Sequence, residues 1–114
     1  MKSNIPKQFN GNQNMNSMIH QARKMQDQIT ALQEDIEQRT FTASAGGGAV
    51  NVTISGKKTI QSIELKPEIV DKDDIEMLQD LIMSAVNEAI NNVEETTENE
   101  MNKITGGVSL PGLF

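Results

Sequence analysis

The chain has 114 residues, of which 36% are apolar and only 3% aromatic, so it has room for one domain with a core of aliphatic side chains. It contains no cysteine, which excludes disulfides, thiolate nucleophiles and most structural zinc sites and suits a reducing compartment. A net charge of −6 argues against indiscriminate binding to polyanions.

Residues 1–13 are polar, show no hydrophobic period and include Pro6 and Gly11, so they predict a disordered N-terminal arm. They lack the apolar stretch of a signal peptide. No run in the chain approaches the roughly 18 apolar residues that cross a membrane. We therefore expect a cytoplasmic protein with no membrane partner.

Apolar residues recur at spacings of three and four between residues 14 and 38 and predict an amphipathic helix. This stripe consists of Met15, Met18, Ala22, Met25, Ile29, Leu32 and Ile36. Three heptads are the lower limit for a coiled coil, so two partners stay open: a sheet or another helix. The face opposite the stripe, which meets solvent or a ligand, carries His20, Arg23, Lys24 and Asp27.

Residues 40–45 and 50–55 alternate apolar and polar side chains, which predicts two β-strands. Three consecutive glycines, Gly46 to Gly48, join them in a hairpin turn. A phosphate-binding loop is a poor alternative, because no Lys-Ser or Lys-Thr pair follows and the glycines lead into a strand instead of a helix.

A third strand is predicted at residues 59–65, after a second turn at Gly56-Lys57-Lys58. Ile60 is out of phase with Ile63 and Leu65, which indicates a β-bulge or a late start of the strand. The three strands should form an antiparallel meander with one apolar and one polar face.

A second long helix follows Pro67. Asp73 with Glu76 three residues later predicts a capping box at its start, and Gly106-Gly107 predicts its C-cap. About thirty helical residues span roughly 45 Å, whereas a compact chain of this size is about 35 Å across. One protomer cannot bury such a helix along its whole length.

We therefore expect a homodimer. The second helix has an unusually broad apolar arc, more than one sheet face needs. The candidate side chains for the dimer contact or the core on the two helices are Met18, Met25, Ile29, Leu32, Leu81, Ile90 and Met101. The predicted fold is α+β, in the order α-β-β-β-α, with a domain at residues 14–106 and a tail at residues 107–114.

Catalytic chemistry finds little support. His20 is the only histidine, and the nearest carboxylate in sequence, Asp27, is seven residues away. The acidic run at residues 94–100 is scattered around a helix and predicts a solvated face. We expect no enzyme, no metal, no cofactor and no small-molecule substrate.

The charge is unevenly spread. Residues 1–63 hold seven Lys/Arg against four acids, whereas residues 64–114 hold three against twelve. Any contact with nucleic acid should use the first half. The candidates are Arg23, Lys24, Lys57 and Lys58. Without Tyr or Trp a single-strand stacking platform is improbable, so contact with the duplex backbone remains.

Four segments, in this order, resemble the bacterial YbaB/EbfC family of nucleoid-associated proteins over about residues 14–114. They are "NMNSMIHQARKMQ", "AGGGAVNVTISGKKTIQSIEL", "EIVDKDDIEMLQDLIMSAVNEAI" and "ITGGVSLPGLF". The resemblance implies an α-β-α protomer, a tight homodimer with projecting helices, and a cytoplasmic protein of the nucleoid. It further implies binding to double-stranded DNA that alters the DNA's conformation, without catalytic residues or cofactor.

The chain departs from the commoner family pattern in two places. Asn51 stands where a lysine is frequent, and Asn91-Asn92 stand where a lysine pair is usual. Both changes remove positive charge. Two functions therefore stay open: a homodimeric DNA-binding protein with roles in nucleoid organisation and gene regulation, or a dimeric protein-interaction scaffold with weak or no DNA binding.

Overall fold

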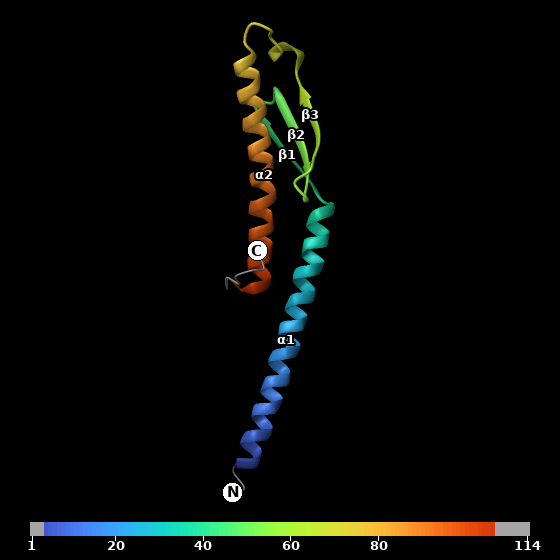
Figure 1. Cartoon of the computed structure of the whole chain (residues 1–114), viewed down its shortest axis with the longest axis vertical. Coiled ribbons are helices and arrows are strands. Elements are labelled where there is room, and N and C mark those ends of the chain that lie inside the picture. The colour runs from blue at the N-terminus through green and yellow to red at the C-terminus, as the bar shows by residue number, and fades with distance from the viewer. Residues whose placement is uncertain (1–3, 107–114) are drawn as a thin grey trace.

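The computed structural model describes the backbone of residues 4–106 and the side chains of residues 14–106 (Figure 1). The predicted class and element order are confirmed. The elements are α1 (Asn4–Gln38), β1 (Thr40–Ala45), β2 (Val50–Ser55), β3 (Ile60–Leu65), the short 3-10 helix η1 (Pro67–Ile69) and α2 (Ile75–Thr105). The tail predicted at residues 107–114 lies outside the described residues.

The chain is a rod and not a sphere. Its principal extents are 88 × 20 × 19 Å and its radius of gyration is 23.4 Å, against about 13 Å for a compact chain of this length. Helix α2 lies along one face of the sheet, while α1 runs away from the sheet and past the end of α2 (Figure 1). One end of the rod is therefore layered, and the other is a single helix.

Helix α1 begins ten residues earlier than predicted. Its backbone is helical from Asn4, where the sequence indicated a disordered arm. Pro6 falls in the first turn, where backbone N–H groups have no helical partner to lose. Gly11 costs only about 1 kcal/mol relative to alanine, and each added residue gains one backbone hydrogen bond once a helix has formed. The predicted end of the helix at residue 38 is confirmed.

The sheet is an antiparallel meander in the order β1-β2-β3, as predicted. The bulge is confirmed too. Thr53 pairs with Ser62, but the next residue of β2, Ile54, pairs with Ile60, so Gln61 is the extra residue. The bulge brings Ile60 to the same face as the side chains of β2 that point toward α2.

The core lies between this sheet and α2. Val50, Val52 and Ile54 of β2 are fully buried under the helix, which contributes Ala85 and Ala89 at their level. Two alanines one turn apart let the helix backbone approach the sheet closely. The other side of α2 faces away from the sheet, as expected for a helix that packs with one stripe.

Both turns of the sheet use glycine for a definite reason. Gly46 has a φ of 64°, which favours glycine, and an added Cβ would lie 3.2 Å from the end of the Leu81 side chain, a tight contact. At Gly56 a Cβ would fall on the carbonyl oxygen of Ile36 at the end of α1. The β2–β3 turn is therefore pressed against the end of α1.

The start of α2 corrects one prediction. The N-cap is Asp74 and not Asp73: the Asp74 carboxylate accepts the Met77 N–H at 3.3 Å. The Asp73 N–H is instead donated to the Asp71 carboxylate at 2.9 Å, within the preceding turn. The predicted glycine C-cap is confirmed at Gly106, with a φ of 66°.

The open question of what the α1 stripe covers is also answered. Only its last part is buried, at Ile29 and Ile36, and it packs beside the C-terminal part of α2, where Met101 is buried. The alternative that the stripe covers the sheet is wrong, because the sheet face is already occupied by α2 (Figure 1). None of the helices within residues 4–106 is long and apolar enough to cross a membrane.

Candidate nucleic-acid interface

The candidate interface is the free part of α1, residues 14–28, which we call the arm. Every side chain in it except Met25 is exposed. Arg23 and Lys24 are neighbours on the face opposite the apolar stripe, with His20 one turn away. A helical arm with solvent on all sides can approach a duplex without steric hindrance from the sheet.

The structure sharpens the charge asymmetry seen in the sequence. Residues 1–28 hold four Lys/Arg against one acid, a net +3, and residues 29–114 hold six against fifteen, a net −9. The whole excess of positive charge therefore precedes the packed part of the molecule. Phosphate groups are attracted to the arm and repelled by the rest of the chain.

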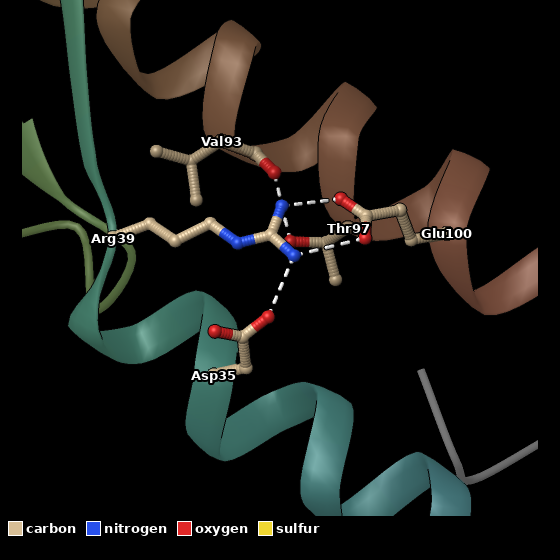
Figure 2. A network of polar contacts seen from close by, with 5 residues as sticks. All are labelled: Asp35, Arg39, Val93, Thr97 and Glu100. Carbon is tan, nitrogen blue, oxygen red and sulfur yellow. Dashed lines mark hydrogen bonds and ion pairs between the residues drawn. The ribbon is translucent and has the colours of Figure 1, made fainter.

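The base of the arm is fixed by one arginine (Figure 2). Arg39, the residue between α1 and β1, reaches to α2, where its two Nη atoms donate to the two Glu100 carboxylate oxygens at 2.5 and 3.0 Å. The same guanidinium donates to Asp35 at 2.7 Å, one turn back on α1. This bidentate contact ties α1, β1 and α2 together at one point.

The contact shifts the pKa values of Arg39 and Glu100 in opposite directions. The hydrogen bonds from Arg39 hold the pKa of the Glu100 carboxyl below its usual value, and burial partly offsets that effect. The carboxylates of Glu100 and Asp35 raise the pKa of Arg39. Both groups are thus fixed in their charged forms at neutral pH.

The second predicted basic pair, Lys57 and Lys58, lies in the β2–β3 turn, and its two members differ in their contacts. Lys57 is exposed. Lys58 adopts a left-handed conformation with a φ of 64°, and its Nζ contacts a Glu94 carboxylate oxygen on α2 at 3.0 Å. The structure therefore does not bring the four predicted residues into one patch: Arg23 and Lys24 are on the arm, and Lys58 is already paired.

Two of the three asparagines that stand where lysine is common in the family, Asn51 and Asn92, make structural contacts. The Asn51 side-chain amide donates to the Gly48 carbonyl at 2.9 Å and closes the glycine turn. Asn92 of α2 donates to the Thr42 carbonyl of β1 at 3.2 Å. Both side chains are engaged with the protein's own backbone.

An apolar surface that sequence reasoning missed lies on β3. Cross-strand partners in a sheet share a face, so Ile63 and Leu65, which pair with Val52 and Val50, point to the α2 side. Helix α2 covers β1 and β2, however, and Ile60, Ile63 and Leu65 stay 40%, 43% and 37% exposed. We call these three side chains the β3 face. The alternation in the sequence predicted that Ile63 and Leu65 point to the apolar face of the sheet. That α2 leaves them uncovered is visible only in the structure.

The side chains predicted to form the dimer contact or the core on the two helices differ in how far they are buried. Ile29 and Met101 are buried, Met25, Leu32, Leu81 and Ile90 are half-buried, and Met18 is 67% exposed. Of the acidic residues on α2, Glu94, Glu95 and Glu98 are exposed. Among residues 14–106 no group of three or more His, Asp or Glu side chains is arranged to hold a metal ion.

Comparison with known protein families shows which family the chain belongs to. Residues 11–108 match the YbaB/EbfC DNA-binding family, which is most of the chain. The chain belongs to this family. The resemblance drawn from the four sequence segments is thereby confirmed.

Relatives of this YbaB/EbfC family member support the assignment. A protein named nucleoid-associated protein from Clostridium acetobutylicum is 57% identical over 103 residues, covering 90% of this chain and 92% of that protein. Proteins of the same name from Alkaliphilus metalliredigens and Thermoanaerobacter pseudethanolicus are 55% and 51% identical, each over at least 91% of both chains.

Solved structures are similar to this YbaB/EbfC family member as well. Among them is the crystal structure of an uncharacterized protein from Helicobacter pylori, with a TM-score of 0.58 and 27% sequence identity. The match covers 68% of this chain and 90% of that one.

Proposed function

We propose that this chain is a nucleoid-associated protein of the bacterial cytoplasm that binds double-stranded DNA as a homodimer and alters its conformation. The observation that carries the proposal is the separation of charge. The net positive charge precedes residue 29, on and before an exposed helical arm, and the rest of the chain is acidic. Membership of a DNA-binding family supports the same partner.

The contacts should be mainly to phosphates. Arg23 and Lys24 supply two cations side by side, but the exposed arm lacks the run of arginine and asparagine side chains that reads base edges in the major groove. A net charge of −9 on the remainder of the chain keeps that part away from the backbone. Affinity should consequently fall steeply as salt increases.

The homodimer is supported by the β3 face. Three large aliphatic side chains on the core side of an edge strand, each more than a third exposed, form the kind of surface that a second subunit covers. Val70, Ile75 and Met77, which follow β3 in the chain, are exposed as well. We propose a two-fold contact in which this surface meets its own copy.

Such a dimer explains how DNA could be deformed. It presents the arm and its charges twice, so one DNA molecule is held at two points on either side of the two-fold axis. Contacts at two fixed points repay the energy of bending the duplex between them, which smooth elastic estimates place at roughly 1–6 kcal/mol for a short site. Nucleoid organisation and gene regulation are the roles that this activity suits.

The test of DNA binding is a titration of unrelated duplexes at low and moderate salt. Arg23→Ala with Lys24→Ala should weaken binding at least about tenfold and flatten the salt dependence. The matched control is Lys66→Ala with Lys72→Ala, which removes two exposed cations from the acidic part of the chain. Equal losses in both variants would contradict the arm as interface, and no binding at micromolar protein in low salt would contradict DNA as partner.

The test of the dimer is the mass by light scattering. Ile63→Asp places a charge in the β3 face and should give a folded monomer, because this side chain is 43% exposed in the single chain. Ser62→Asp adds the same charge to the neighbouring residue on the other face of β3 and should leave the dimer intact. A wild-type monomer at working concentrations would contradict the proposal.

The rival function is a dimeric scaffold for another protein. It is favoured by one observation, the exposed apolar side chains on β3 and on the arm. The same titration separates the two functions, since a scaffold would not bind the duplex. We also propose that the chain performs no catalysis, because its single histidine, His20, is exposed on the arm.

A further inference from the structure

Helix α1 and strand β1 are joined by one residue, Arg39. Its backbone is engaged on both sides: the Arg39 N–H donates to the Ile36 carbonyl at 3.0 Å, and its carbonyl accepts the Gly56 N–H at 3.0 Å. Its guanidinium holds Glu100 of α2 and Asp35 of α1 (Figure 2). A single residue has only two soft backbone torsion angles. The contacts that restrain Arg39 therefore restrain the direction of the arm.

Apolar packing alone does not fix this direction. Ile29, Ile36 and Met101 are buried where α1 lies beside α2. Hydrophobic contacts are non-directional, however, and crossing angles between packed helices scatter by about 15–20°. The junction also has a hollow of about 260 Å³ between α1, the β2–β3 turn and α2, with Gln33 and Thr97 in its walls. Helix α1 therefore has room to tilt at this place.

The guanidinium supplies a contact with a defined direction. Two parallel hydrogen bonds from a planar fork to one carboxylate fix the angle between the two groups as well as their distance. Glu100 belongs to the layered part of the molecule, since α2 packs on the sheet through Ala89 and Val93. Asp35 holds the same guanidinium from α1 at 2.7 Å. Arg39 thus links the end of α1 to a fixed point on α2.

The length of α1 amplifies any change at this junction. Arg23 lies sixteen residues before Arg39, a distance of about 24 Å along the helix. A tilt of about 10° at the junction would move Arg23 by about 4 Å, more than the rise of about 3.4 Å per phosphate along one DNA strand. A small tilt therefore changes which phosphates the arm meets.

We propose that Arg39 is a positioning residue: its fork to Glu100 fixes the direction of the arm, and this direction sets how strongly the dimer bends the duplex. The second half of this inference rests on the proposed function. Arg39 acts through the arm and not through contact with DNA, because its guanidinium is occupied by two carboxylates. Breaking the fork leaves Arg23 and Lys24 on the arm, so DNA is still bound but is bent less.

Spin labels measure the direction of the arm without DNA. One label is attached at Ser17→Cys on the arm and the other at Ser84→Cys on α2, both exposed sites in a chain that has no cysteine of its own. Dilution with unlabelled wild type leaves one labelled chain per dimer. The intact fork should give a narrow distribution of distances, and Glu100→Ala should broaden it at least about twofold, because the contact that sets the angle is lost.

Two further variants identify the cause of any broadening. Glu98→Ala makes the same change of charge at an exposed position of α2 and should leave the distribution narrow. Arg39→Lys keeps the positive charge but cannot form the fork, so it should broaden the distribution as Glu100→Ala does. A narrow distribution in either fork variant, or equal broadening in Glu98→Ala, would overturn the proposal.

Bending is measured by energy transfer between dyes at the two ends of a short duplex saturated with protein. Glu100→Ala should bind within about twofold of Glu98→Ala, because the cations of the arm are unchanged, but should bend the duplex at most about half as much. Equal bending by the two variants would overturn the proposal. A failure of the wild type and all variants to bind would instead overturn the proposed function, and the label distances would still decide whether Arg39 fixes the arm.

Discussion

The two ends of the rod are built on different principles. At the sheet end, Val50, Val52 and Ile54 are fully buried beneath α2, and the layered structure excludes water. On the arm, residues 14–28, not one described side chain is buried. The sheet end carries the net negative charge and the arm end the net positive charge.

This contrast separates stability from recognition. Burial of aliphatic side chains supplies the free energy of folding, and it is concentrated where the charge would repel DNA. The arm contributes little to folding and can present its cations freely. Substitutions in the sheet should therefore change stability but not recognition, and substitutions on the arm should change recognition but not stability. Four predictions test this independence, from the largest expected effect to the smallest.

The largest effect is expected in the sheet. Ile54→Ala should lower the free energy of unfolding by about 2–5 kcal/mol, because it opens a cavity in a fully buried site. Ile19→Ala on the arm, where the side chain is 50% exposed, should cost less than about 1 kcal/mol. Urea denaturation at a fixed protein concentration measures both. Similar losses would contradict the separation.

The next effect is expected where the two ends meet. Gly56→Ala should cost about 1–3 kcal/mol, because the new Cβ falls on the Ile36 carbonyl oxygen and forces α1 away from the turn. Lys57→Ala, at the next residue, should change stability by no more than about 0.5 kcal/mol. The same denaturation experiment compares them, and a neutral Gly56→Ala would mean that the turn and α1 move apart freely.

A smaller, pH-dependent effect is expected at the base of the arm. Because the pKa of the Glu100 carboxyl is depressed by Arg39, its contribution to stability is present above the ordinary value of 4.5 and is lost as the pH falls through the lower folded value. Glu100→Gln should lower the Tm by a few degrees at pH 7, and the difference should shrink as the pH falls below the ordinary carboxyl value.

The control for this prediction is Glu98→Gln, the same change at an exposed position of α2. It should leave the Tm nearly unchanged across the whole range. The effect at Glu100 stays small because both partners are partly exposed, at 36% for the Arg39 and 26% for the Glu100 side chain. A Tm difference that does not shrink as the pH is lowered below the ordinary carboxyl value would contradict the ion-pair explanation.

The smallest effect concerns the lysine turn and rests on the proposed function. Glu94→Gln releases Lys58 from its contact with α2 and should strengthen DNA binding about twofold at low salt. Glu95→Gln changes the net charge equally at an exposed neighbour and should strengthen it less. Equal gains would show that net charge alone, and not the release of Lys58, governs the change.

The first two strands could be predicted from sequence to the residue, and the third to within one residue. The alternation at residues 40–45 and 50–55 is uninterrupted, and glycines mark the turn between them. Even the bulge was visible, because Ile60 breaks the phase set by Ile63. These features depend on local periodicity, which a single sequence displays in full.

Features that depend on distant partners could not be predicted. Nothing near Arg39 in the sequence indicates Glu100, which follows 61 residues later. The inward phase of Ile63 does not tell which strands α2 will cover, and adjacent aspartates gave no basis for choosing Asp74 over Asp73 as N-cap. The early start of α1 was missed because its first ten residues have no apolar period to mark them.

The slender outline has a practical consequence. A particle 88 Å long and 20 Å wide experiences far more friction than a sphere of the same mass. It will elute early from a gel-filtration column calibrated with globular standards, so one chain can be mistaken there for two. End-over-end tumbling will also be much slower than rotation about the long axis, and a fluorophore on the arm will report the slow motion only if its dipole lies along α1.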